Sequence, residues 1–99
     1  MTYRVSLTAK ARDDIRRLYS YMLERDEEAA ERALDAITSS IRLLEDFPFS
    51  FRKAAAGNGL IRELLVLFGS SGYVVLFRIT NATTVTIAAV RHQREDDYH

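Results

Sequence analysis

The segment LIRELLVLF at residues 60–68 begins the stretch that decides the fold, and YVVLFRI at 73–79 and TVTIAAVRH at 84–92 complete it. All three segments are rich in β-branched or aromatic residues, and the residues between them (GSSG at 69–72, NAT at 81–83) are typical of turns. The stretch therefore predicts a three-stranded antiparallel meander. The middle segment is apolar at both alternating sets of positions, which predicts a central strand covered on both faces.

The first half of the chain supplies elements that would cover this sheet. Residues 3–7 alternate apolar and polar, which predicts a half-buried first strand added to the meander. Thr8 is a suitable N-cap for a helix through about Arg25, and Asp26 caps a second helix that runs to about Asp46. Apolar residues recur every three or four positions in both helices, which predicts an antiparallel helical hairpin. The expected fold is α+β, in the order β-α-α-β-β-β, with this hairpin packed on one face of an antiparallel sheet.

The connection between the two halves contains three closely spaced aromatic residues. Pro48 ends the second predicted helix, and Phe47, Phe49 and Phe51 alternate around it. We expect these three rings to form a hydrophobic plug beneath a loop. Residues 52–59 contain alanine and glycine with no fixed pattern, which indicates a flexible loop.

Length and composition restrict the class of protein. We expect one domain over residues 1–99, with a short C-terminal tail at 94–99. The chain has no cysteine, and His92 and His99 are too few for a zinc site without carboxylates, so we expect no metal and no cofactor. The first residues lack the apolar core of a signal peptide, and no apolar run approaches the length of a membrane span. These features predict a cytoplasmic protein with no membrane partner.

Charge is distributed unevenly although the net charge is zero. Residues 24–46 contain eight acids and three arginines, whereas Glu63 is the only acid in 47–94, where there are six basic residues. The basic second half indicates a partner that carries negative charge. The overall balance falls short of that of a dedicated nucleic-acid binder, so we expect no sequence-specific DNA binding by the chain alone.

Two groups of residues could carry chemistry. If the first turn is centred between Ser70 and Ser71, Glu63 lies opposite Arg78, which predicts a cross-strand ion pair. If the second turn is centred near Ala82, His92 lies opposite the Gly72 end of the central strand, six residues from Arg78 along the sheet, or roughly 20 Å at about 3.3 Å per residue. A single active site that uses both residues is hard to build.

The second group is the segment RHQR at 91–94 with Tyr98 and His99 in the tail. RNA cleavage needs a base for the 2′-hydroxyl, a cationic clamp for the phosphate and an acid for the leaving oxygen, and this group contains such residue types. The alternative interpretation is a strand end followed by an acidic tail without catalytic function.

The chain resembles a known family over nearly its whole length, namely the ParE branch of the RelE/ParE toxins of bacterial type II toxin–antitoxin systems. The matching segments are Leu7-Thr8 leading into a helix with Asp14-Ile15 and residues 18–21, Phe47-Pro48, GLIREL at 59–64, YVVLFR at 73–78 and VRHQRE at 90–95. The resemblance implies a toxin that a cognate, ParD-like antitoxin holds silent, in a hetero-oligomer.

The resemblance also implies two different targets. ParE-like members act on DNA gyrase without a bound cofactor, whereas RelE-like members cut messenger RNA on the ribosome with basic, tyrosine or histidine residues. The residues that resemble this catalytic set are Arg62, Arg78, His92 and Tyr98. We expect a gyrase inhibitor without catalytic residues of its own. The alternatives are a ribosome-dependent endoribonuclease and a non-toxic scaffold that binds only the antitoxin.

The resemblance, together with the surface features of the chain, also indicates which residues bind the antitoxin and the target. An exposed helical face, a sheet edge and the basic second half suit an acidic antitoxin segment that folds on binding. The expected antitoxin contacts are Ile15, Leu18, Tyr19, Met22, Arg62, Arg78, Arg91 and Arg94. The expected contacts to the toxin's target lie in the tail and are Arg94, Tyr98 and His99.

Overall fold

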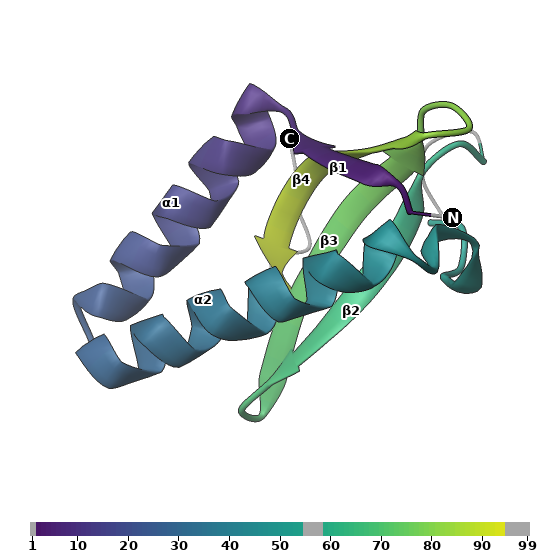
Figure 1. Cartoon of the computed structure of the whole chain (residues 1–99). Coiled ribbons are helices and arrows are strands. Elements are labelled where there is room, and N and C mark those ends of the chain that lie inside the picture. Colours follow the sequence, from purple (N-terminus) through teal and green to yellow (C-terminus); the bar gives the residue numbers. More distant parts are fainter. Residues whose placement is uncertain (1, 55–58, 95–99) are drawn as a thin grey trace.

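Two helices cover one face of a four-stranded sheet (Figure 1). The computed structural model describes residues 2–54 and 59–94. The sheet order is β1-β4-β3-β2. The elements, in chain order, are β1 (Arg4–Leu7), α1 (Ala9–Leu23), α2 (Glu27–Arg42), the 3-10 helices η1 (Leu43–Glu45) and η2 (Pro48–Ser50), β2 (Arg62–Phe68), β3 (Ser71–Ile79) and β4 (Thr84–His92).

The predicted α+β fold and element order are confirmed, with one correction to the sheet. Strands β2, β3 and β4 form the predicted antiparallel meander with β3 in the interior. Strand β1, however, runs parallel to β4, with Arg4 opposite Thr84 and Leu7 opposite Ile87, so the sheet is mixed and not antiparallel throughout. The helical hairpin explains the difference, because two antiparallel helices return the chain to the end of the sheet where β1 began. Strand β2 therefore starts in the same direction as β1.

The first hairpin has a different register from the one expected. Phe68 faces Ser71, so the turn is centred one residue earlier than predicted, at Gly69 and Ser70. Gly69 has a φ of 63°, a left-handed conformation that glycine adopts without steric cost. Glu63 consequently faces Leu76, and the predicted ion pair with Arg78 is wrong.

The second hairpin contains a bulge. Leu76 of β3 faces Ala89, but the next residue, Phe77, faces Ile87, so Ala88 is an extra residue in β4. Beyond the bulge the pairing continues until His92 faces Tyr73. The bulge is important for the site described below because it sets which backbone groups of β4 point toward α1.

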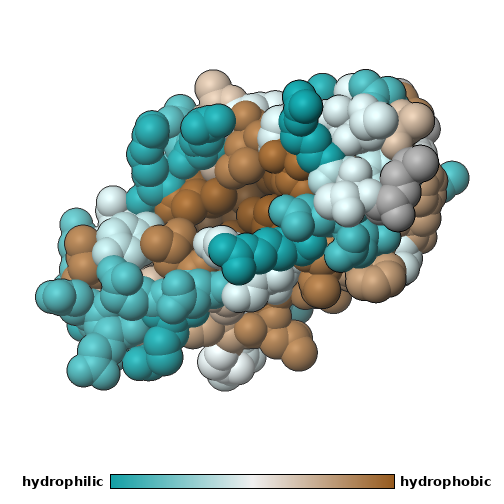
Figure 2. All heavy atoms as spheres, in the orientation of Figure 1, coloured by the Kyte–Doolittle hydropathy of each residue, from teal (hydrophilic) through white to brown (hydrophobic). Residues whose placement is uncertain are grey.

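Both predicted helix caps are confirmed. The Thr8 side chain accepts a hydrogen bond from the Ala11 N–H at 3.0 Å, and Asp26 accepts one from the Ala29 N–H at 3.1 Å. The two helices form a V whose apex is the loop at 24–26, and its arms diverge over the sheet (Figure 1). A space-filling view shows apolar side chains at the bottom of the hollow between the arms (Figure 2).

The core lies between the helices and the sheet. Its largest fully buried side chains are Phe77, Leu44, Ile87, Val75, Val85, Val90 and Pro48. The predicted aromatic plug is wrong for two of its three rings. Phe51 packs edge-on against Phe77, with ring centroids 6.2 Å apart, but Phe47 and Phe49 are 56% and 63% exposed. The chain coils into η2 here instead of running extended, so alternate residues do not share a face, and buried Pro48 takes the inner position.

The predicted loop at 52–59 is only partly a loop in the described residues. Lys53 forms an isolated antiparallel bridge with Arg62, and the Ala54 N–H donates to the Ile61 carbonyl at 2.7 Å. Glu63, which was expected to pair with Arg78, instead accepts a hydrogen bond from Arg52 Nε at 2.6 Å. Residues 55–58 lie outside the described part of the chain.

Candidate functional site

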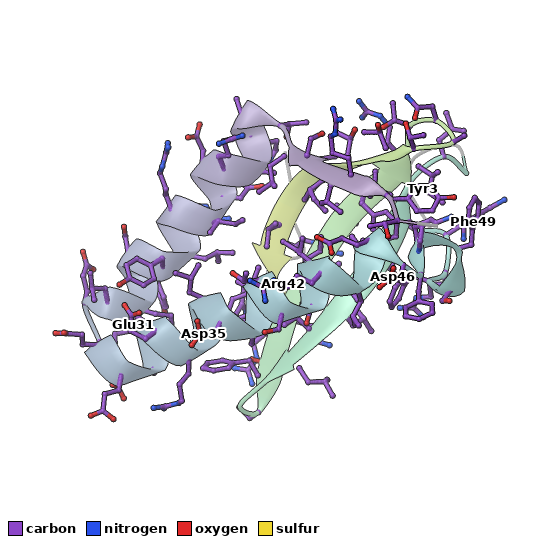
Figure 3. All side chains as sticks on the ribbon, viewed as in Figure 1. Tyr3, Glu31, Asp35, Arg42, Asp46 and Phe49 are labelled. Atoms are coloured by element: carbon purple, nitrogen blue, oxygen red, sulfur yellow. The ribbon has the colours of Figure 1, made fainter. Side chains whose placement is uncertain are left out.

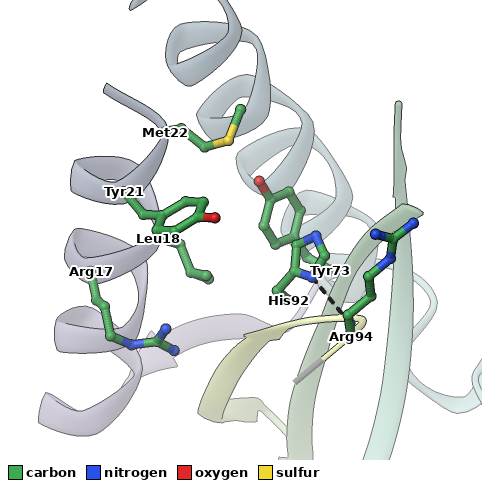
Figure 4. Close-up of a pocket in the computed structure, with 7 residues that line it drawn as sticks. All are labelled: Arg17, Leu18, Tyr21, Met22, Tyr73, His92 and Arg94. Carbon is green, nitrogen blue, oxygen red and sulfur yellow. Dashed lines mark hydrogen bonds between the residues drawn. The ribbon is translucent and has the colours of Figure 1, made fainter. Parts of the chain in front are cut away.

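A groove of about 400 Å³ opens between α1 and the ends of β3 and β4 (Figure 4). Helix α1 forms one wall, and the two strands form the other. The lining residues are Arg17, Leu18, Tyr21 and Met22 from α1, Tyr73 from β3, His92 at the end of β4, and Arg94 just beyond it.

The spacing of residues on α1 produces one wall of the groove. Leu18 and Met22 are four residues apart, as are Arg17 and Tyr21, so each pair occupies one stripe of the helix. Leu18 is buried and Met22 half-buried, whereas Arg17 and Tyr21 are exposed. The groove therefore has an apolar floor and a polar rim on this side.

His92 on the opposite wall is held in one orientation by two hydrogen bonds. The Arg94 backbone N–H donates to Nδ1 at 3.1 Å, and Ser71 Oγ lies 3.1 Å from Nε2. A backbone N–H can only donate, so Nδ1 is an acceptor and the proton of the neutral ring is on Nε2, which donates to Ser71. The ring also packs edge-on against Tyr73, with centroids 5.6 Å apart. His92 is thus a fixed part of the wall.

Tyr73 forms the base of the same wall. Its side chain is 3% exposed and packs against Phe68, with ring centroids 6.1 Å apart. Burial raises the pKa of the Tyr73 phenol, because the apolar surroundings disfavour its anion. At neutral pH Tyr73 therefore presents an uncharged ring to the groove.

The two arginines of β2 and β3 lie far from this groove. Arg62 donates to the Phe51 carbonyl at 2.7 Å, and its guanidinium lies 5.4 Å from the centre of the Phe49 ring. Phe49 and Tyr3 mark that end of the molecule in Figure 3. Arg78 is exposed and lies five positions along β3 from Tyr73, the residue opposite His92. At about 3.3 Å per residue this separation is roughly 17 Å, so the structure confirms that Arg78 and His92 lie in different regions.

The residues expected to bind the antitoxin fall into three regions. Leu18, Met22 and Arg94 line the groove, whereas Ile15 and Tyr19 line a smaller space between the helices. The Tyr19 hydroxyl donates to Glu31 of α2, a residue labelled in Figure 3, and this hydrogen bond is the main reason that the pKa of Tyr19 is raised. A third region holds the sheet arginines.

The sheet arginines lie at two different ends of the sheet. Arg91 faces Val74 across the strands, next in sequence to the groove residue His92. Arg62 and Arg78 occupy neighbouring registers at the far end of the sheet, because Arg62 faces Phe77. Tyr98 and His99 lie outside the described residues.

Three of the groove residues were not predicted from the sequence. Arg17 and Tyr21 could have been identified from their position one residue before the predicted contacts Leu18 and Met22. Tyr73 could have been found from the predicted hairpin, which already placed the start of β3 beside His92. Within residues 2–54 and 59–94, no group of three histidine, cysteine or acidic residues could hold a metal ion. Among the same residues, no helix is long and apolar enough to cross a membrane.

Comparison with solved structures identifies the same fold in two toxin–antitoxin complexes. A chain of the chromosomal ParDE toxin–antitoxin system from P. aeruginosa has a TM-score of 0.73 at 15% identity, covering 92% of this chain and 96% of that one. A chain of the toxin–antitoxin complex RelBE2 from Mycobacterium tuberculosis has a TM-score of 0.67 at 22% identity, covering 96% and 95%. At these identities the comparison establishes the fold alone.

Sequence comparison identifies the family. The toxin RelE3 of Caulobacter vibrioides is 36% identical over 91 residues, which cover 92% of this chain and 95% of that toxin. The toxin RelE1 of the same organism is 28% identical over 95 residues, covering 96% and 98%. Residues 5–97 match the family model of the ParE toxin of the type II toxin–antitoxin system parDE. The chain therefore belongs to the ParE toxin family, within the RelE/ParE superfamily of type II toxins.

Proposed function

We propose that this toxin inhibits DNA gyrase by binding it, without catalysis of its own, and that a ParD-like antitoxin neutralises it by occupying the groove. The observation that carries the proposal is the state of His92. Both of its ring nitrogens are engaged, Nδ1 by the Arg94 N–H and Nε2 by Ser71. A general base needs a lone pair directed at the substrate, and this arrangement leaves none available.

The separation of the cationic residues supports the same proposal. An endonuclease of the RelE kind would need Arg62, Arg78 and His92 around one phosphate, but Arg78 lies roughly 17 Å along the sheet from the His92 register at about 3.3 Å per residue. Arg62 is also engaged, by the Phe51 carbonyl. We therefore assign no catalytic residue in the described part of the chain.

A second candidate function, cleavage of messenger RNA, is favoured by one observation. The two similar curated toxins are named RelE3 and RelE1, although this chain matches the ParE family model. Under this alternative, Arg62, Arg78, His92 and Tyr98 would form the catalytic set, and the turn at Arg94 would have to open to release the His92 lone pair.

Pulse labelling of DNA and protein synthesis in parallel, minutes after the chain alone is induced in a bacterial host, tests these alternatives. An early loss of DNA synthesis with translation intact supports gyrase inhibition. An early loss of translation supports the endonuclease and contradicts the argument from His92. If neither process falls, the third interpretation, a scaffold that binds antitoxin but is not toxic, is favoured.

The groove has the surface chemistry expected of an antitoxin site. Its floor is apolar and its rim carries Arg17 and Arg94, which suits an amphipathic segment with acidic residues that becomes ordered on binding. The two structural matches come from complexes of a toxin with its antitoxin, which supports a partner of this kind and a hetero-oligomer. Leu18 and Met22 would receive the apolar side chains of the segment. Ile15 and Tyr19 would extend the contact along α1.

Charge reversal tests how far the antitoxin extends beyond the groove. We expect Arg94→Glu to weaken antitoxin binding strongly at low salt and less at high salt, because screening reduces the repulsion of an acidic partner. Calorimetric titration of the antitoxin into the variants Arg62→Glu, Arg78→Glu and Arg91→Glu then reports whether the bound antitoxin also contacts the sheet. A loss of affinity in these variants would indicate that it does. Unchanged affinity of Arg94→Glu at both salt concentrations would remove the groove as the site.

The tail is proposed to contact the target. Deleting residues 95–99 removes Tyr98 and His99 but keeps Arg94, so we expect loss of toxicity with antitoxin binding retained. Loss of both properties, or of neither, would contradict this assignment.

A further inference from the structure

Asp14 is the only charged residue among the described residues that is buried, at 7% exposure. It lies on α1, one turn before Leu18 of the groove. Its Oδ2 accepts a hydrogen bond from the backbone N–H of Val90 at 3.0 Å, a contact between residues 76 positions apart. Lys10 Nζ approaches both carboxylate oxygens, at 3.2 and 3.1 Å, and Arg17 lies 3.9 Å away.

The need for this contact follows from the short first strand. Strand β1 ends at Leu7, opposite Ile87, and among the described residues no strand pairs with 88–92 of β4 on that side. Backbone groups that point this way would be unpaired beneath α1, which is costly in a buried position.

Two side chains, one from the cap of the first helix and one from the helix itself, take the place of the missing strand. Thr8 Oγ1 donates to the carbonyl of Ala88, the bulge residue, at 3.1 Å, while the Thr8 N–H donates to the Ile87 carbonyl at 3.0 Å. Asp14 accepts from Val90 two residues further along. Because the acceptor is a carboxylate, this last hydrogen bond is charge-assisted and stronger than an ordinary one.

We propose that Asp14 is a positioning residue for the groove: by holding the Val90 N–H, it fixes the last residues of β4, and with them His92 and Arg94, at a set distance from α1. Val90 is two residues before His92, and Arg17, Leu18 and Tyr21 follow Asp14 on the same helix. The Asp14–Val90 hydrogen bond therefore links the two walls close to the residues that line the groove.

The free toxin is sufficient to test the positioning role, since the contact involves no partner. Asp14→Leu keeps a side chain of similar size but cannot accept a hydrogen bond, whereas Asp14→Asn keeps an acceptor oxygen. We expect amide hydrogen exchange of Val90, relative to core amides of β3, to rise roughly tenfold or more in Asp14→Leu. The NMR resonances of His92 and Arg94 should shift in the same variant, and Asp14→Asn should restore most of both effects.

A control separates positioning from loss of stability. Val85→Ala weakens the core at the other end of β4, where Val85 is fully buried five residues before Val90. Equal changes at Val90 in Val85→Ala and Asp14→Leu, or faster exchange at Val90 without any shift of His92 and Arg94, would overturn the inference.

The effect on antitoxin binding rests on the proposed function. Asp14→Leu should lower antitoxin affinity by more than Val85→Ala does, and Asp14→Asn should remain close to the wild type. If His92 and Arg94 shift as expected but affinity does not change, the positioning role stands and the groove is wrong as the antitoxin site. The two failures are therefore distinguishable.

Discussion

Replacing Gly72 by alanine is expected to open the end of the first hairpin. A Cβ at this position would lie 2.1 Å from the Val66 carbonyl oxygen and 3.1 Å from its carbon, where ordinary contacts begin at 3.4 Å. Both atoms belong to the backbone of β2 and cannot rotate away. The strands must therefore separate by more than an ångström at the Leu67–Gly72 pair, which also disturbs the pair of Phe68 and Ser71 beyond it.

The cost can be estimated from two contributions. Overpacking of a buried position costs about 1–3 kcal/mol, and each ladder hydrogen bond lost costs about 0.5–1.5 kcal/mol. With one ladder hydrogen bond lost, the sum is about 1.5–4.5 kcal/mol, a large share of the roughly 5–15 kcal/mol that stabilises a domain. At about 4–8 °C per kcal/mol for a domain of this size, the melting temperature should fall by about 6–36 °C.

The assay is thermal and urea unfolding followed by circular dichroism, with Gly69→Ala as the control. Gly69 has a positive φ, but no atom lies within 4 Å of the place that an added methyl group would take, so that variant should lose only about 1–2 kcal/mol to backbone strain. Gly72→Ala should also weaken the groove wall, because the Gly72 carbonyl accepts the Gln93 N–H at 2.8 Å. A melting temperature for Gly72→Ala equal to or above that of Gly69→Ala would refute the reasoning.

Three further substitutions test separate contacts. Thr8→Ala removes the α1 cap and the hydrogen bond to Ala88, so urea unfolding should show a loss of about 1–2 kcal/mol, which Thr8→Ser should largely restore. Tyr73→Phe addresses pH dependence: burial raises the folded pKa of Tyr73 above the ordinary value of 10.0, so its contribution to stability is complete below that pH and is lost as the pH rises through the folded value. The unfolding free energy of the wild type should therefore fall more steeply above pH 10 than that of Tyr73→Phe, and parallel curves would contradict this. Arg52→Met breaks the ion pair with Glu63, but the arginine side chain is 70% exposed. The free energy of unfolding should therefore fall by less than about 1 kcal/mol, which a small decrease in melting temperature would report.

Local signals in the sequence predicted most of the fold. Thr8 and Asp26 cap helices because their side chains satisfy the first free N–H groups, a requirement that does not depend on the rest of the chain. The direction of β1 was not predictable in this way. The alternating pattern of β1 indicates that one face of the strand is buried. It does not indicate which strand β1 pairs with or in which direction, since parallel and antiparallel pairing place the same residues inward.

The register errors have similarly specific causes. The sequence is compatible with two centres for the first turn, Gly69-Ser70 and Ser70-Ser71, which differ by one residue in strand register. Only the left-handed φ of Gly69 selects the first of them. The bulge at Ala88 has no signature in TIAAV, because an extra alanine leaves the apolar pattern intact. Phe47 and Phe49 were misplaced because alternation implies a shared face only in extended chain, and η2 is coiled.

The candidate site was predicted in part because it draws on both halves of the chain. The helical face indicated Leu18 and Met22, and the end of β4 indicated His92 and Arg94, but nothing in the sequence states that these two sets face each other. Their meeting depends on β1 stopping at Leu7, which lets α1 cross beside β4 from Ala88 onward.

The shortness of β1 thus accounts for both the groove and its support. A longer first strand would pair with β4 as far as His92 and would fill the space that α1 now spans, leaving no groove between helix and sheet. Because the strand stops early, the exposed backbone of β4 needs other partners, and Thr8 and Asp14 provide them at Ala88 and Val90. The early end of β1 therefore opens the groove and also leaves the Val90 N–H in need of an acceptor from α1. This need explains why the interface between α1 and β4 retains the buried carboxylate of Asp14.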